Sequence, residues 1–398
     1  MINRPDYLEK LRRWKDRDVI KVVTGVRRCG KSTLLRMYAD SLIAQGVPEN
    51  RIITLNLEQL ENESFLDYHL LHDEIISRLT SEAMHYVFID EVQNVPDFQK
   101  AIDSLYTRPN IDLYITGSNA MLLGGTLATL LSGRYVEVAM TPLSFAEYAS
   151  ATEPGTFSLA RIYSRYISQG SFPATTGFAQ DSLALHDYLE GILNTVLLKD
   201  VAQRLNIANT LGLGALVDFM FDNIGNLTSI KRIADTLTAQ GSKISHNTVA
   251  EYLSALCNSY ILYPAKCYDV RGKRLLKLQG KYYAVDMGMR RVLLSNQVRD
   301  TGRILENVVF LELMRRNGSV FVGRWENLEV DFVVQGPQGP SYFQVAESVR
   351  DEATLSREIA PLAKIADNYP KCLLTLDDTD PVDHGGIRQI NALDWLLS

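Results

Sequence analysis

Residues 25–32 read Gly25-Val-Arg-Arg-Cys-Gly-Lys-Ser32, a complete G-x-x-x-x-G-K-S pattern. An apolar, β-branched run precedes it at 19–23, and a stretch of helix-forming composition follows it at 33–38. Between a strand and a helix, the glycines let the backbone curl so that successive N–H groups and a helix N-terminus point at one anion. The segment therefore predicts a site for the phosphates of a nucleotide.

The whole loop is expected to contact the nucleotide, and we expect ATP and Mg²⁺ as cofactors. Lys31 reaches the β- and γ-phosphates in such a loop, and the Ser32 hydroxyl ligates Mg²⁺. Cys29 lies near a helix N-terminus, which lowers a thiol pKa, but a filler residue is favoured over a redox switch. Arg27 and Arg28 are solvated or close to phosphate, and neither is assigned a role. The predicted nucleotide-contacting residues are Gly25, Val26, Arg27, Arg28, Cys29, Gly30, Lys31, Ser32 and Thr33.

A second segment, Tyr86-Val-Phe-Ile-Asp-Glu91, is an apolar strand that ends in two carboxylates. After a phosphate loop, the Asp at such a strand end holds Mg²⁺, so Asp90 is predicted as a metal ligand with Ser32. Glu91 can polarise the attacking water as general base. A kinase of small molecules has no need of that base, so the pair favours hydrolysis.

A third strand at 113–116 ends in Gly117-Ser-Asn119. A polar side chain at that strand tip reaches the γ-phosphate and the attacking water, and Ser118 and Asn119 are both candidates, with Ser118 favoured. Further strands are expected at 51–57 and 135–138. Strands that alternate with helical stretches predict a parallel sheet with helices on both faces and nucleotide at the carboxyl ends of the strands.

These motifs resemble the AAA+ class of P-loop ATPases, and more closely a large prokaryotic family that joins an AAA domain to a C-terminal domain of unknown function. The resemblance covers nearly the whole chain, through Leu-Ser-Gly-Arg at 131–134, Pro-Leu-Ser-Phe-Ala-Glu-Tyr at 142–148, Glu-Val-Asp-Phe at 329–332 and Gly-Gly-Ile-Arg at 385–388. It implies that Arg134 reads the γ-phosphate, in its own or a neighbouring subunit, because a guanidinium pairs bidentately with phosphate oxygens. A surface arginine at a turn is the equal alternative.

Composition bounds the class of protein. A chain of 398 residues exceeds one ordinary core, and 46% hydrophobic with 22% charged residues is typical of globular proteins. The four cysteines have no disulfide or zinc spacing, and no apolar run approaches membrane-spanning length, so a cytoplasmic protein without a membrane partner is expected. A net charge of −6 gives no global attraction to nucleic acid, so such binding needs a local patch.

Residues 266–281 form such a patch, which we call the basic ribbon, with six basic residues against one acidic residue. Two short helices are expected upstream, at 228–237 and 245–256, the second capped by Ser245. Helix, turn, helix and basic ribbon outline a winged helix, which predicts DNA contact with His246, Asn247 and Thr248 at the reading end. The alternative is a spacer between domains.

The C-terminal part has Glu306 in an apolar helix at 305–313, followed by strands at 319–322, 330–334 and 342–345. This order resembles the PD-(D/E)XK nuclease core, and the resemblance implies Glu306 and Asp331 as metal ligands. Gln344 stands where the second strand carboxylate belongs, and Ala346 where the lysine belongs. We therefore expect a nuclease-like fold that has lost catalysis and keeps a docking role for a protein partner.

The expected architecture is α/β, with a P-loop NTPase parallel sheet. It divides into an AAA+ P-loop ATPase domain at 1–150, a helical lid or linker at 151–210, a winged-helix-like domain at 211–280 and a degenerate PD-(D/E)XK nuclease-like domain at 281–398. The expected function is Mg²⁺-dependent ATP hydrolysis that drives a motor or switch on a partner, with DNA as one candidate and a homo-oligomer allowed for. The alternative is a nucleotide-gated interaction module with negligible turnover, and an ATP-dependent nuclease is disfavoured.

Overall fold

The computed structural model describes residues 2–118, 120, 133–152, 157–178, 181–207, 210–294 and 300–398, with the backbone alone at 277–279. Within it the chain forms two compact units. The first comprises Met1–Pro142 and Asn258–Tyr260, and the second comprises Leu143–Cys257 and Ile261–Ser398. In the described part, no helix is both long and apolar enough to cross a membrane.

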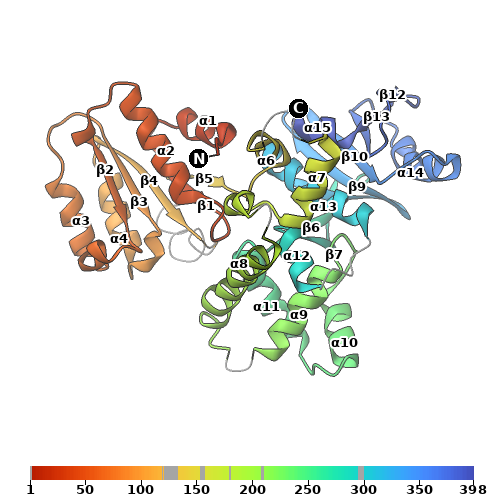
Figure 1. Ribbon diagram of the computed structural model, residues 1–398, viewed down its shortest axis with the longest axis horizontal. Helices are drawn as coiled ribbons and strands as arrows, with labels where there is room; N and C mark the ends of the chain where they lie inside the picture. The colour runs from red at the N-terminus through yellow and green to blue at the C-terminus, as the bar shows by residue number, and fades with distance from the viewer. Residues whose placement is uncertain are drawn as a thin grey trace. The chain divides into compact units, whose positions relative to one another are not determined.

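The first unit is built on a five-stranded sheet in which all neighbours are parallel, in the order β2-β3-β4-β1-β5 (Figure 1). This confirms the parallel sheet predicted from the alternation of strands and helices. Because β1 lies between β4 and β5, the loop that follows it opens between two neighbouring strands at their carboxyl ends. The strands are β1 (Ile20–Thr24), β2 (Ile52–Asn56), β3 (His85–Asp90), β4 (Ile111–Gly117) and β5 (Tyr135–Ala139).

Alternating residues of the strands bury both faces of this sheet. Val87 and Ile89 of β3 pack with the helices α3 (Tyr68–Ser77) and α4 (Phe98–Tyr106) in one apolar cluster. Phe88, which points the other way, lies edge-on to Tyr38 of α2 (Lys31–Ala44), with 6.2 Å between ring centroids. The remaining helical elements of the unit are α1 (Pro5–Arg13), η1 (Glu49–Arg51), η2 (Leu60–Phe65) and η3 (Val92–Asn94).

The second unit contains an eight-stranded mixed sheet in the order β12-β13-β11-β10-β9-β8-β6-β7. Gly336 pairs with Gly339 where β9 turns into β10, so the two strands form an antiparallel hairpin. The strands are β6 (Leu262–Asp269), β7 (Arg274–Ala284), β8 (Val320–Trp325), β9 (Leu328–Gly336), β10 (Gly339–Ala346), β11 (Lys371–Thr375), β12 (Val382–Asp383) and β13 (Ile387–Asn391).

Helices form the rest of the second unit. The helix α8 (Ser182–Thr195) continues as the π-helical segment η6 (Val196–Ala202). The helical elements before the sheet are α6 (Phe145–Ser150), α7 (Leu159–Gln169), η5 (Pro173–Gly177), α8 (Ser182–Thr195), η6 (Val196–Ala202) and α9 (Leu211–Asp222). Two more helices precede the first strand of this sheet, α10 (Ile230–Ala239) and α11 (His246–Asn258). Later in the chain are α12 (Met287–Leu293), α13 (Thr301–Asn317), α14 (Glu352–Lys364) and α15 (Ala392–Leu397).

The helix-turn-helix outline is present as α10 and α11, and Ser245 caps α11 because its hydroxyl accepts from the Thr248 N–H at 3.1 Å. The β6–β7 hairpin follows, as the ribbon pattern predicted. It differs from a free-standing wing, however, because β6 pairs with β8 and so joins the sheet of the C-terminal region. The domain boundaries at 150, 210 and 280 stay predictions.

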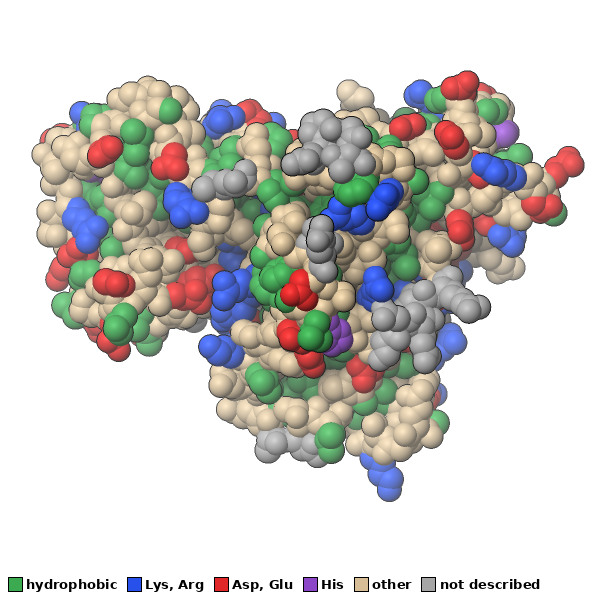
Figure 2. Space-filling model, viewed as in Figure 1, with side chains coloured by type: hydrophobic (Ala, Val, Ile, Leu, Met, Phe, Trp, Pro, Cys, Tyr) green, Lys and Arg blue, Asp and Glu red, His purple; other side chains and the backbone are tan. Residues whose placement is uncertain are grey.

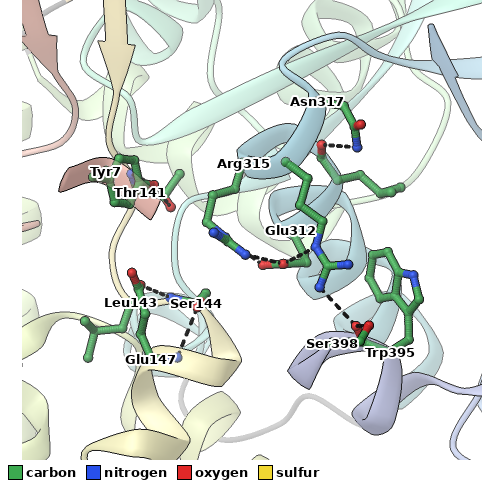
Figure 3. Close-up of polar contacts among 12 residues, drawn as sticks. Tyr7, Thr141, Leu143, Ser144, Glu147, Glu312, Arg315, Asn317, Trp395 and Ser398 are labelled. Carbon is green, nitrogen blue, oxygen red and sulfur yellow. Dashed lines mark hydrogen bonds and ion pairs between the residues drawn. The ribbon is translucent and has the colours of Figure 1, made fainter. Parts of the chain in front are cut away.

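A cluster of charges on α13 fixes the C-terminal helix. Glu312 is 3% exposed and accepts hydrogen bonds from Arg315, at 2.9 Å, and from Arg316 (Figure 3). Arg316 also donates to the Trp395 carbonyl of α15 at 3.0 Å. The buried carboxylate is thereby satisfied by two guanidinium groups, which is what burial of a charge requires.

Candidate functional site: a phosphate loop facing two carboxylates

The predicted phosphate loop lies between the end of β1 and the start of α2. Gly25 has φ +143° and Gly30 has φ +106°, both in the region that favours glycine. A Cβ added at Gly25 would meet the Met140 carbonyl oxygen at 2.1 Å, so a side chain cannot fit there. Gly30 is the N-cap residue of the fourteen-residue helix α2, whose unpaired N–H groups face the loop.

Lys31 is 4% exposed and lies back over its own loop. Its ammonium donates to the carbonyls of Gly25, at 3.2 Å, and of Val26, at 3.3 Å. It also lies 3.6 Å from a carboxylate oxygen of Glu91. The lysine is thus positioned at the concave side of the loop, where an anion brought to the helix N-terminus meets it.

Asp90 lies at the end of β3, next to the loop serine. The Ser32 and Thr116 hydroxyls both hydrogen-bond to its carboxylate, with 2.5 Å from the Thr116 oxygen. Burial raises the pKa of Asp90, while these two hydrogen bonds act in the opposite direction. Hydroxyl and carboxylate oxygens are the ligands that Mg²⁺ prefers, so the pair Ser32 and Asp90 fits the metal that the sequence predicts.

Glu91 turns its carboxylate toward the loop. The residue has φ +54°, a left-handed conformation that a non-glycine residue seldom adopts and that is concentrated at functional sites. Its N–H donates to Thr116 at 2.9 Å, and its side chain, in a residue 6% exposed, accepts from the Gln93 amide. The carbonyl oxygen of that Gln93 amide is buried and has no hydrogen-bond partner in the described protein. Gln93 was missed by the sequence reasoning, although it follows Glu91 by two residues.

Ser118, at the tip of β4, is fully buried, and its hydroxyl has no hydrogen-bond partner among the described residues. A buried polar group without a partner costs about 1–3 kcal/mol, so such a group is notable where a ligand is expected. Asn119, the other candidate for this position, lies outside the described residues.

Two residues near the N-terminus, which no sequence motif indicated, form hydrogen bonds that support the phosphate loop and the segment after β5. Arg4, 3% exposed, donates to the Cys29 carbonyl at 3.1 Å and to the Thr141 carbonyl at 2.8 Å. Tyr7 of α1 hydrogen-bonds to the Thr141 side chain at 3.1 Å (Figure 3). The phosphate loop is therefore tied to the segment that leaves β5.

Of the other predicted loop residues, Val26 is buried, whereas Ser32 and Thr33 are not. The Cys29 thiol is fully buried, and burial raises its pKa, so the lowering expected from the helix N-terminus is not found. Arg27 forms an ion pair with Glu58 at 3.3 Å. Arg28 is exposed and has φ +66°.

Arg134 lies at the wrong end of β5 for a role in its own nucleotide site. Ile20, at the start of β1, donates to the Arg134 carbonyl at 2.8 Å, whereas the phosphate loop follows the other end of β1. A five-residue strand separates the two ends by about 13 Å. The guanidinium forms an ion pair with Asp103 of α4 at 2.5 Å. A γ-phosphate contact by Arg134 therefore requires a neighbouring subunit and stays a prediction.

The basic ribbon is less basic than its sequence indicated. Lys281 is 3% exposed and takes no part in a surface patch. Arg271 pairs with Glu326 at 2.9 Å, and Arg274 lies 3.5 Å from Asp269. Over the face of the molecule drawn in Figure 2, acidic and basic side chains are interspersed. Lys266 and Lys273 remain as exposed cations.

Lys281 instead enters a group that we call the Lys281 cluster. Its ammonium lies 2.7 Å from Glu306, 2.8 Å from Glu329 and 3.6 Å from Asp331, and the Tyr283 hydroxyl donates to Glu306 at 2.7 Å. This corrects the expectation that the nuclease-like region offers two carboxylates and no lysine. Glu329 could have been found from the sequence, because it precedes Asp331 by two residues, and residues two apart on a strand lie on the same face.

One family model, described as an AAA domain, matches residues 17–149, and another, described as a domain of unknown function, matches residues 160–300. A Walker-type ATPase of Pyrococcus abyssi superposes with a TM-score of 0.54 at 15% identity, over 74% of this chain and 96% of that one. At that identity the likeness shows the fold alone.

Two relatives align along most of their length. An uncharacterized protein of Haemophilus influenzae is 39% identical over 400 residues, which cover 100% of this chain and 99% of that protein. An uncharacterized protein of Methanocaldococcus jannaschii is 30% identical over 388 residues, with coverages of 90% and 82%. With the phosphate loop and the paired carboxylates in place on a parallel sheet, the chain belongs to this prokaryotic family of P-loop AAA ATPases that carry a domain of unknown function after the AAA domain.

Proposed function

We propose that the protein binds ATP with Mg²⁺ and hydrolyses it, and that hydrolysis drives a switch or motor acting on a partner. The observation that carries the proposal is the position of Glu91. Its carboxylate lies 3.6 Å from the loop lysine and follows Asp90, which hydrogen-bonds to Ser32. A general base beside the phosphate-binding groups is the arrangement that hydrolysis needs.

Each residue of the site has a separate role in this proposal. Lys31 exchanges its carbonyl and Glu91 partners for the β- and γ-phosphates, which leaves the Glu91 carboxylate free to accept a proton from water. Ser32 and Asp90 would hold Mg²⁺, which neutralises charge on the phosphates when it is bound. The buried Ser118 hydroxyl at the tip of β4 has no partner among the described residues, which supports it as the group that reads the γ-phosphate.

Gln93 is a positioning residue in this scheme. Its amide N–H donates to Glu91, and the amide oxygen, which has no partner in the described part of the chain, is available to accept from the attacking water. An amide that orients water for a nearby reacting group is a recurring device in nucleotide hydrolysis.

The alternative function is a nucleotide-gated interaction module with negligible turnover, which signals to a protein through its C-terminal part. Such a module gains little from a water-activating carboxylate. The buried, oriented Glu91 therefore favours hydrolysis over binding alone.

DNA is proposed as one partner of the second unit. The support is the helix-turn-helix of α10 and α11, whose first turn exposes His246 and Asn247, and the exposed lysines of the basic ribbon. Surface ion pairs such as Arg271 with Glu326 are weak, so they exchange readily for a phosphate. A homo-oligomer is part of the proposal only in so far as Arg134 acts on a neighbouring subunit.

The first prediction concerns the loop lysine. Lys31→Ala should abolish ATP binding, because its ammonium offsets the charge of the β- and γ-phosphates. Titration of a fluorescent ATP analogue into the wild type and the variant measures the loss. Wild-type affinity in the variant would show that this loop is not the nucleotide site.

The second prediction separates binding from chemistry. Glu91→Gln should keep ATP binding and slow steady-state hydrolysis by ~10²–10⁴-fold, as expected for loss of a general base. Glu58→Gln, on an exposed carboxylate of the same unit, is the matched control and should hydrolyse normally. An unchanged turnover number in Glu91→Gln would favour the interaction module instead.

The third prediction tests Gln93. Gln93→Ala should lower kcat by about tenfold with little change in KM, because orientation of Glu91 and water is lost while the phosphate contacts remain. Gln93→Glu should also lower kcat, because a carboxylate has no amide N–H to donate to Glu91. A purely structural role predicts lower stability with neither effect.

The fourth prediction concerns DNA. The protein should bind duplex DNA with an affinity that falls steeply as salt rises, and replacing Arg271, Lys273 and Arg274 together should flatten that slope by at most about three phosphate contacts. Replacing Arg357 and Lys364, exposed cations of α14, should leave the slope unchanged. No binding at low salt, or equal slopes for both variants, would leave the helix-turn-helix as a spacer.

A further inference from the structure

The Lys281 cluster brings one cation and three carboxylates together from three separate elements. Lys281 comes from β7, Glu306 from α13, and Glu329 and Asp331 from one face of β9. The nuclease resemblance implies a divalent metal held by Glu306 and Asp331 at this place. The residues present do not fit that metal, because the ammonium of Lys281 already contacts both carboxylates.

We propose that Lys281 is the resident cation of this cluster and replaces the divalent metal ion that a nuclease-like site would hold. Its distances of 2.7 Å and 2.8 Å to Glu306 and Glu329 are those of charge-assisted hydrogen bonds from an ammonium. Metal–oxygen distances would be about 2.0–2.6 Å, and a divalent ion could approach the same oxygens only beside an existing positive charge.

The carboxylates of the Lys281 cluster are largely buried, and buried charges need a partner of opposite charge. The Lys281 side chain is 4% exposed, and those of Glu306 and Asp331 are 13% and 11% exposed. Burial alone would lower the pKa of Lys281, but Glu306, Asp331 and Glu329 together raise it, so the ammonium stays charged. Burial and the nearby Glu306 raise the pKa of Asp331. Without Lys281, Glu306 and Asp331 would lose their ammonium partner, and Arg324, 3.9 Å from Glu329, would be left as a cation beside the three carboxylates.

Neighbouring groups of β10 and α14 hold Asp331 in this position through hydrogen bonds. One Asp331 oxygen accepts from the Val345 N–H at 2.9 Å, which turns the other toward Lys281. Gln344, where the nuclease pattern has a carboxylate, accepts from the Asp331 N–H at 3.3 Å and donates to Glu358 at 3.0 Å. No set of three His, Cys, Asp or Glu residues in the described part of the chain has the geometry to hold a metal ion.

The experiment is a titration of nucleotide-free protein with Mn²⁺, read by calorimetry and by thermal unfolding. Wild type should show no Mn²⁺ binding that depends on Asp331, and it should not cleave DNA or RNA with Mn²⁺. Lys281→Ala should be less stable and should gain one Mn²⁺ site, with a rise in unfolding temperature of roughly 4 °C or more at saturation. Adding Asp331→Asn to that variant should remove the gain.

Two matched variants sharpen the result. Lys281→Met fills the same space without charge and should be destabilised with no gain of Mn²⁺ binding. Lys266→Ala, an exposed lysine on the neighbouring strand, should behave as wild type. Asp331-dependent Mn²⁺ binding or cleavage by the wild type would overturn the proposal even if Lys281→Ala fails to fold. A Lys281→Ala protein as stable as wild type, with no response to Mn²⁺, would also overturn it.

Discussion

The hydroxyl of Thr116 joins the two halves of the candidate nucleotide site. It donates to Asp90 at 2.5 Å and accepts from the Glu91 N–H at 2.9 Å, so a single side chain of β4 sets both carboxylates at the end of β3. The parallel register makes this contact possible, because Ile89 pairs with Ile115 and the next residue of each strand follows side by side. The left-handed turn at Glu91 is held by the same bond, and it faces that carboxylate toward Lys31. Ser32 then completes a chain of polar contacts from the loop through β3 to β4.

Much of this site was predictable from the sequence, because local signals and the parallel sheet agree. The strand before Gly25, the helix after Ser32 and the apolar run that ends at Asp90 each have a clear period. Parallel strands bring such strand ends to one edge. Gln93 and Arg4 could not be found in the same way, since an amide two residues past a strand and an arginine near the N-terminus have no pattern of their own. Their roles follow from contacts between segments far apart in the sequence, such as Arg4 with Thr141.

The sequence-based predictions were wrong for residue types that occur both at the surface and in the interior. Lys281 belongs to a run of basic residues, and composition alone places such a run on the surface. Strand β7 turns this lysine inward, where Glu306 and Glu329 compensate its charge. Cys29 is a similar case, because its position at a helix N-terminus suggested an acidic thiol, whereas complete burial dominates. Desolvation and the charges of neighbouring groups set the pKa of both side chains. Both depend on contacts between residues that are far apart in the sequence.

The path of the backbone bears on how the first unit is supported. The chain leaves the first unit after Pro142, returns to it for Asn258–Tyr260 only, and leaves again. During that return the Tyr260 hydroxyl donates to Glu137 at 3.3 Å, and the same carboxylate accepts from Thr24 at 2.6 Å, one residue before the phosphate loop. A fragment cut after Pro142 therefore carries the whole G-x-x-x-x-G-K-S pattern and yet lacks part of its own support. The first unit is therefore discontinuous in sequence, because Asn258–Tyr260 belongs to it although more than a hundred residues separate this segment from Pro142.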